Sequence, residues 1–213
     1  SSGSQLFENK ALDVAFNVPE GWLLQQPKKT GENSPDVVAV GPKVGLINPV
    51  FSLTISNAKG KTLDDLIKEK DEFLKNALKS GNLEIISQEK STINEKQAYV
   101  TNARGFFQSN GTSYNVQFRE VIISTPEKFY TFAYSNGVDN FADQISRFEE
   151  SVNSFKITSE PTKEVKSPVS DTPNPSTLFS NQDLTIFILL GVTAAIGASV
   201  AVILKKRKKH ESL

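Results

Sequence analysis

The residue types that most often perform enzyme chemistry are almost absent from this chain. Its only histidine is His210, close to the C-terminus, and it contains no cysteine. Nucleophilic triads need a histidine beside a serine or cysteine, and zinc sites need several Cys or His ligands. Residues 1–159 contain no histidine and no cysteine, so these sites are excluded there, and thiol redox chemistry is excluded as well. We therefore predict a non-catalytic protein without a cofactor or a metal site.

Carboxylates are the remaining candidates for chemistry. Asp64, Asp65, Asp71 and Glu72 fall within one predicted helix, where a charged face ordinarily only meets solvent. No run of carboxylates has the spacing of an EF-hand calcium loop. A hydrolase that uses two carboxylates on surface glycans is a distant alternative, and it would need two facing Asp or Glu in a cleft.

The sequence Asn110-Gly111-Thr112 supports two interpretations. It fits the acceptor pattern for N-glycosylation, which would place Asn110 on a surface outside the cytoplasm. Asn-Gly between two runs of alternating apolar residues is also a strong signal for a tight hairpin turn. The two interpretations are compatible, and the sequence leaves both open.

The longest uncharged apolar stretch runs from Leu184 to Leu204. At about 1.5 Å per residue, a helix of this length measures roughly 30 Å, the hydrocarbon thickness of a bilayer. Positive charge accumulates on the cytoplasmic flank of such spans. We therefore predict a single-pass protein of the cell membrane, with the N-terminal part outside and the C-terminus cytoplasmic. The basic residues that follow the span are Lys205, Lys206, Arg207, Lys208 and Lys209.

Small residues recur at four-residue and three-residue spacing inside this span, at Gly191, Ala195 and Ala198. Such spacing lets two membrane helices approach closely, so a helix–helix contact in the bilayer is one interpretation. Glycine and alanine are also common in spans that pack against lipid alone. The sequence does not distinguish a helix–helix contact from packing against lipid alone.

Charge is unevenly distributed along a chain whose formal net charge is zero. Ahead of the span, 19 Lys and Arg stand against 23 Asp and Glu. Binding to a phosphate backbone needs a basic face, so we expect no nucleic acid partner. A protein partner and the lipid bilayer are the expected contacts.

Composition divides the chain into four parts. Residues 1–159 are long enough for one domain with its own core. Residues 160–183 are rich in Pro, Ser and Thr, which predicts an extended stalk. The membrane helix covers residues 184–204, and residues 205–213 form a basic cytoplasmic tail.

Hydrophobic periodicity in the first part predicts an α+β fold, with helices packed on a mainly antiparallel sheet. Strands are expected over residues 12–18, 22–24, 37–40, 50–56, 83–88, 96–108, 112–125 and 128–135. One helix of about 17 residues begins after Thr62. Its apolar stripe, which is expected to face the core, consists of Leu63, Leu66, Ile67, Phe73, Leu74, Ala77 and Leu78. A second helix begins near Asp139, and its apolar stripe has spacings of 4, 3, 4 and 3 residues through Phe141, Ile145, Phe148, Val152 and Phe155. A parity switch in the strand from residue 112 to residue 125 predicts a bulge near Arg119 and Glu120.

Two irregular stretches, Lys28–Asp36 and Lys43–Pro49, are the predicted recognition surface. Binding residues concentrate in loops on a rigid scaffold, although surface loops with no role are common. Trp22, just after the Pro19 turn, is expected in the core, with a groove-lining position as the alternative.

Two stretches carry a resemblance to a known family. The first is Val14-Ala-Phe-Asn-Val-Pro-Glu-Gly-Trp22, and the second runs from Phe129-Tyr-Thr-Phe-Ala-Tyr134 through a helix that ends at Ser154-Phe155. Over about residues 6–157 the chain resembles the PsbP-like family, named for an extrinsic photosystem II subunit. The resemblance implies an α/β/α sandwich, shared with a Ran-binding import factor, and a non-catalytic binding or assembly role. The predicted anchor departs from the extrinsic subunits, and no metal or catalytic residue of the family can be matched here.

Three functions follow, in order of preference. The first is a non-catalytic binding module that presents a protein-interaction surface on a stalk outside the membrane. The second is an accessory or assembly subunit of a larger membrane enzyme complex. The third is the carboxylate-based hydrolase.

Overall fold

The computed structural model describes residues 3–79, 81–109 and 111–159. The predicted stalk, membrane span with its small residues, and basic tail lie outside the described residues, as does Asn110. Across the described ranges, no helix is both long enough and apolar enough to cross a membrane.

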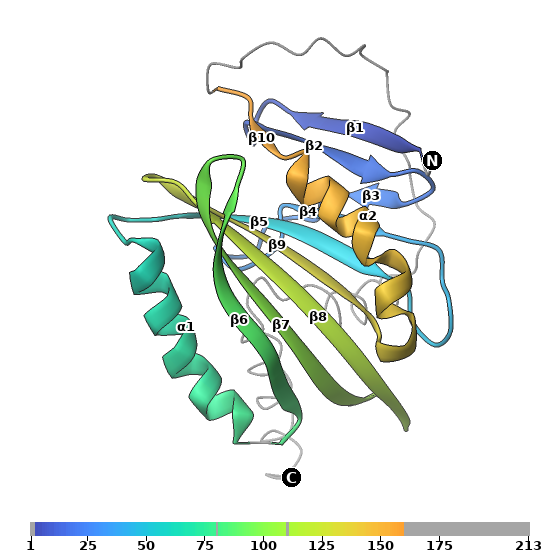
Figure 1. The fold of residues 1–213 in the computed structure, drawn as a ribbon. Helices are drawn as coiled ribbons and strands as arrows, with labels where there is room; N and C mark the ends of the chain where they lie inside the picture. The colour runs from blue at the N-terminus through green and yellow to red at the C-terminus, as the bar shows by residue number, and fades with distance from the viewer. Residues whose placement is uncertain (1–2, 80, 110, 160–213) are drawn as a thin grey trace.

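Two sheets of antiparallel strands make up most of the domain (Figure 1). The larger has seven strands in the order β3-β4-β5-β9-β8-β7-β6, and the smaller has the order β1-β2-β10. The seven strands are β3 (Leu23–Gln25), β4 (Val37–Val40), β5 (Val50–Asn57), β6 (Leu83–Ile93), β7 (Lys96–Ser109), β8 (Thr112–Ser124) and β9 (Lys128–Gly137). The three are β1 (Ser4–Asn9), β2 (Val14–Pro19) and β10 (Lys156–Ile157).

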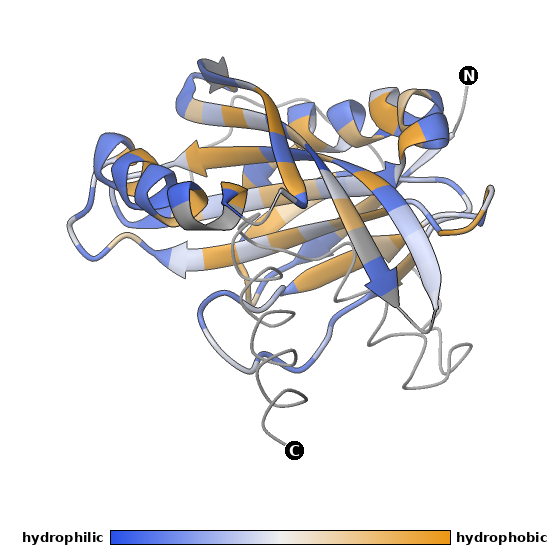
Figure 2. Ribbon diagram, turned by 90° about the horizontal axis from the view of Figure 1, so that it is seen from below, coloured by the Kyte–Doolittle hydropathy of each residue, from blue (hydrophilic) through white to orange (hydrophobic). Residues whose placement is uncertain are grey.

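Two α-helices pack on the seven-stranded sheet. Helix α1 (Leu63–Leu78) begins with a capping box, in which the Asp65 backbone N–H donates to Thr62 Oγ1 and the Thr62 N–H donates to the Asp65 carboxylate. A 3₁₀ turn, η1 (Val138–Asn140), leads into α2 (Phe141–Asn153). Hydropathy alternates along the strands and around both helices (Figure 2). The predicted α+β class, with two helices on a mainly antiparallel sheet, is confirmed.

One face of the large sheet forms a single apolar core with α2 and the small sheet. Its largest side chains have no exposed surface: Phe16, Phe51, Phe132, Tyr134 and Phe148. The rings of Phe16 and Phe132 lie 5.5 Å apart, and those of Tyr134 and Phe148 lie 5.4 Å apart. The Tyr134 hydroxyl donates a 2.9 Å hydrogen bond to the Phe141 carbonyl, so this polar group is satisfied inside the core.

The opposite face contacts α1 through smaller clusters. The N-terminal half of α1 packs on Tyr99 and Ile122 through Leu63. The C-terminal half packs on Ala103 through Leu74. Residues on this face alternate along each strand with residues of the α2 core, so the two helices lie on opposite faces of the sheet.

The prediction that Phe73 and Leu78 point into the core is wrong. Both are about 40% exposed, at 39% and 40%. The buried stripe of α1 instead runs through Leu63, Lys70 and Leu74, which are separated by seven and four residues and therefore share one side of a helix. Counting only apolar residues hid the lysine that belongs to this stripe.

The predicted bulge near Arg119 and Glu120 is also wrong. The pairing of β8 with β7 and with β9 continues through both residues without a shift. The parity of apolar residues changes because β8 is buried on both faces, with Phe118 on one and Val121 on the other. The shift in register lies on β6, between Ile85 and Ser87.

Sequence periodicity missed three features of the strands. It did not predict β1 or β10, and it ended β6 five residues early. Strand β6 runs to Ile93 and turns back through Asn94 and Glu95, which both have positive φ. Two consecutive positive φ values fit a type I′ turn, which asparagine tolerates well. Asn94 was therefore a usable signal.

Candidate functional site

A cleft of about 530 Å³ opens at one end of the seven-stranded sheet. Figure 1 shows this end at the lower edge of the molecule, where β6 begins, β7 ends and β8 begins. The cleft is lined by residues 45–47, 81–84, 104–106, 113–115 and 137–140. These segments are far apart in the sequence and meet only because the strand ends and η1 lie side by side.

A tight turn in the loop between β4 and β5 forms one part of this lining. Val44 and Ile47 pair as an isolated antiparallel bridge, so Gly45 and Leu46 are the central residues of the turn. Gly45 has φ of +75°, whereas Leu46 does not have positive φ, which is the pattern of a type II′ turn. Ile47 is buried against Val116, but Leu46 is 68% exposed. The turn therefore holds a large apolar side chain out in solvent.

This turn is fixed at several points. The Asn140 side-chain amide donates to the Val44 carbonyl at 3.3 Å. A Cβ atom on Gly45 would lie only 2.9 Å from Asn140 Nδ2, so glycine is needed for this approach. At the base of the loop, the Gly41 N–H donates to the Pro49 carbonyl at 2.8 Å. Leu46 is consequently presented by an ordered support.

Polar side chains supply much of the remaining lining. Three are amides, Asn82, Asn115 and Asn140. Three are charged: Glu84, Arg104 and Asp139. Glu84 on β6 stands directly opposite Arg104 on β7, so these two charges are neighbours across the strands. Asp139 lies in η1. With Asp139, the lining holds two carboxylates and one cation.

Exposed apolar side chains gather near the cleft. Among the described residues, the large hydrophobic side chains with substantial exposure are Leu6, Val44, Leu46, Phe73, Leu78, Ile86 and Phe106. Leu46 and Phe106 line the cleft, and Val44 belongs to its turn. Leu78 and Ile86 lie within three residues of lining segments, whereas Leu6 lies on β1. Grouped exposed apolar side chains commonly mark interaction surfaces.

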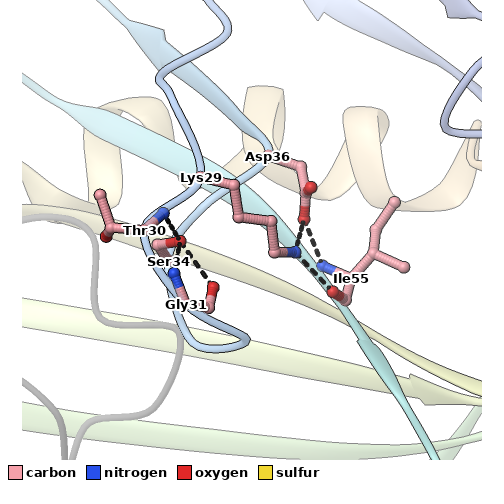
Figure 3. A network of polar contacts seen from close by, with 6 residues as sticks. All are labelled: Lys29, Thr30, Gly31, Ser34, Asp36 and Ile55. Carbon is pink, nitrogen blue, oxygen red and sulfur yellow. Dashed lines mark hydrogen bonds and ion pairs between the residues drawn. The ribbon is translucent and has the colours of Figure 1, made fainter.

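Only one of the two predicted recognition loops contributes to the cleft. The loop over residues 43–49 supplies its turn. The loop over residues 28–36 instead forms a compact polar network against β5 (Figure 3). Lys29 Nζ contacts Asp36 Oδ2 at 2.7 Å, and the same carboxylate oxygen accepts the Ile55 N–H at 2.8 Å. This network fastens the loop to the sheet.

Three of the four carboxylates singled out on α1 have structural contacts. Asp65 caps the helix, Asp64 pairs with Lys90 at 2.7 Å, and Glu72 pairs with Lys75 at 2.9 Å. Across the residues that the structure describes, no three His, Cys, Asp or Glu side chains gather in a way that could hold a metal ion. Trp22 lies in the core beside Phe51, with ring centroids 5.5 Å apart.

The most unusual electrostatic feature lies away from the cleft, between α1 and the sheet. Lys70 and Glu120 form an ion pair with side-chain exposures of 8% and 1%. Burial lowers the pKa of the Lys70 ammonium group to about 7, against a smaller opposing effect of Asp71. Glu120 Oε2 and the hydroxyl of Thr101, opposite it on β7, find no hydrogen-bond partner in the described part. This pair interrupts the apolar contact of α1.

Sequence reasoning missed most of the cleft. Arg104, Phe106 and Tyr114 sit in strands whose alternation gives no sign that their ends converge. Leu46 had a usable signal, because it is a large apolar residue directly after a glycine in a predicted loop.

Comparison of the sequence with family models and with curated proteins found no match. Comparison of the fold with solved structures found similar chains. The solution structure of cyanobacterial PsbP (CyanoP) from Synechocystis sp. PCC 6803 aligns with a TM-score of 0.55 and 23% identity, over 74% of this chain and 94% of that one. The fold is PsbP-like.

Two further structures align less closely. LpqN of Mycobacterium tuberculosis, described as involved in cell envelope biogenesis, has a TM-score of 0.48 and 16% identity over 68% of this chain and 83% of its own. The Pseudomonas aeruginosa protein PA94 has a TM-score of 0.48 and 12% identity over 78% of this chain and 99% of its own. At these identities the likenesses concern the fold alone.

Proposed function

We propose that this chain is a single-pass protein of the cell membrane whose outer PsbP-like domain binds a protein partner without catalysis. The observation that carries the proposal is the Val44–Ile47 turn, which holds Leu46 in solvent beside a cleft. An exposed apolar side chain on a fixed support loses little conformational entropy on binding, so it suits an interface anchor. The grouping of exposed apolar side chains around the cleft supports the same role.

The cleft lies far from the end of the described chain, which leaves it accessible to a partner in the proposed topology. The described chain ends just after β10, and Asn94 at the far end of β6 donates to the Phe155 carbonyl next to that strand. The cleft lies at the other end of β6, by Leu83 and Glu84. An 11-residue strand spans roughly 35 Å. The cleft therefore lies about one strand length from the point where the predicted stalk would begin.

Binding without catalysis fits the two carboxylates of the cleft. A glycosidase keeps one carboxylic acid protonated near neutral pH, usually by burial among apolar groups. Glu84 and Asp139 are both exposed to solvent, and Glu84 stands opposite Arg104. Neither carboxylate has such apolar surroundings, so both are placed to contact a ligand.

Site-specific photo-crosslinking in native membranes tests the proposal. We would place the photoreactive residue at Leu46 and, as a matched control, at Leu6, which is also exposed but lies on β1. We expect one protein to be captured repeatedly at position 46 and not at position 6. Equal capture at both positions, or none at position 46, would contradict a docking role for the cleft.

The same experiment addresses the accessory-subunit alternative. A subunit packed into a larger complex through its membrane helix would co-purify with that complex in mild detergent even when Leu46 is replaced by serine. Loss of the partner with Leu46→Ser favours the cleft as the contact. External protease that failed to reach residues ahead of Asp183 in intact cells would refute the topology.

A further inference from the structure

The lining of the cleft specifies a kind of partner segment. We propose that it takes an extended peptide with a bulky apolar side chain next to a lysine or arginine. This inference rests on the proposed function and adds the chemistry of the ligand.

Leu46 and Phe106 provide the contact for the apolar side chain. They are 68% and 40% exposed and come from the turn after β4 and the end of β7. Val138, half-buried in η1, adds a third apolar surface to the same lining. An apolar side chain that enters between such groups removes all of them from water, and burial of apolar area is the main source of affinity at interface anchors.

The amide side chains of the lining match a peptide backbone. An asparagine amide both donates and accepts hydrogen bonds, as a peptide group does, and Asn115 and Asn140 face the cleft. Gly105 and Gly137 also line the cleft, but their main chains are already paired within the sheet. The amides therefore offer an extended peptide partners for groups that would otherwise lose hydrogen bonds to water.

Charge selects a basic neighbour for the apolar side chain. Glu84 and Arg104 stand opposite each other across the strands and carry charges of opposite sign. Asp139, in the first turn of η1, remains as the unbalanced carboxylate. It favours a lysine or arginine on the ligand and disfavours phosphate and other anions.

A peptide fits this lining better than a glycan does. Sugar hydroxyls would hydrogen-bond to the amides and carboxylates equally well, but the C–H face of a sugar ring offers less apolar surface than a bulky apolar side chain does to Leu46 and Val44, which are 68% and 45% exposed at the rim. The exposed aliphatic groups therefore favour a peptide.

Selection from a random peptide library tests the inference. The target is the full chain, residues 1–213, in detergent micelles, and the probe is a phage-displayed library of random peptides. We expect enrichment of sequences with an aromatic or large aliphatic residue beside Lys or Arg. A synthetic copy of an enriched peptide should bind about tenfold more weakly to Leu46→Ser, because an interface anchor is lost.

Two further variants make the outcome specific. Asp139→Asn should weaken binding severalfold and remove the preference for the basic residue while the apolar preference persists. Leu6→Ser should bind as the unmodified chain does, and matching far-UV circular dichroism spectra would show that all variants are folded. Peptide binding that is unchanged in Leu46→Ser, or the absence of any enriched motif, would overturn the inference.

Two further results distinguish a glycan ligand from a peptide, and a failure of this inference from a failure of the proposed function. Binding of the full chain to an array of neutral glycans that is lost in Leu46→Ser would overturn the peptide assignment. If crosslinking at position 46 still captures one protein while no peptide motif emerges, the proposed function stands and only this inference fails.

Discussion

The two faces of the seven-stranded sheet are covered in different ways. The face under α2 shares one cluster of 20 buried apolar residues with the small sheet. The face under α1 has separate clusters of three to five buried residues. Buried polar residues lie between them, among them Ser52, Thr101 and Glu120. Because apolar burial is the main favourable term in folding, the α2 side should determine global stability and the α1 side should contribute less.

The largest expected effect tests the α2 core. Phe148→Ala should lower the free energy of unfolding by about 3–5 kcal/mol, because it removes a fully buried ring that packs on Phe51 and Tyr134. Urea unfolding measures this change. The matched change on the other helix, Leu66→Ala, should cost clearly less, since Leu66 is only partly buried. Equal losses would refute the difference between the faces.

The next effect tests the ion pair that divides the α1 contact. Lys70→Met should lower the free energy of unfolding by about 3 kcal/mol, because Glu120 loses its partner inside the protein. The double variant Lys70→Met with Glu120→Leu should recover most or all of that loss, as apolar groups can replace a buried pair. A double variant that is no more stable than the single one would show that the pair is required for the packing of α1.

A smaller effect follows from the pKa of Lys70. This pKa is about 7 in the folded protein, against an ordinary value of 10.5. At pH values between these two, the unfolded chain therefore binds one more proton than the folded protein does. The free energy of unfolding should therefore rise with pH, by about 1 kcal/mol per pH unit from about pH 7.5 to pH 9.5. Burial raises the pKa of Tyr99 and Tyr134 above 10, which keeps both protonated in this window.

Urea unfolding at several pH values, on the unmodified chain and on the double variant, measures the dependence. The double variant lacks Lys70, so the rise should disappear. A rise of the same size in both would assign it to another group.

The smallest effect concerns the turn at the cleft. Leu46→Ala should change the free energy of unfolding by less than about 0.5 kcal/mol, because the side chain is largely in solvent. Its neighbour Ile47 is buried, so Ile47→Ala should cost several times more in the same measurement. A large loss for Leu46→Ala would show that this residue supports the fold and weaken its assignment to binding.

Local sequence signals predicted much of this molecule for clear physical reasons. Thr62 and Asp65 form a capping box that depends only on neighbouring residues, so the start of α1 could be read from the sequence. The 4-3-4-3 spacing of the apolar residues from Phe141 to Phe155 predicted which side of α2 faces the core. The two-residue link between Ser109 and Thr112 followed from turn chemistry, and their pairing is confirmed.

The tertiary structure alone decided where polar residues are buried and where strand ends meet. Lys70 became part of the core because Glu120, 50 residues away, lies beneath it. The cleft exists because the ends of β6, β7, β8 and β9 converge beside a turn that no local pattern connects to them. Short-range patterns record the preferences of neighbouring residues, whereas a buried pair and a cleft depend on the register of distant strands.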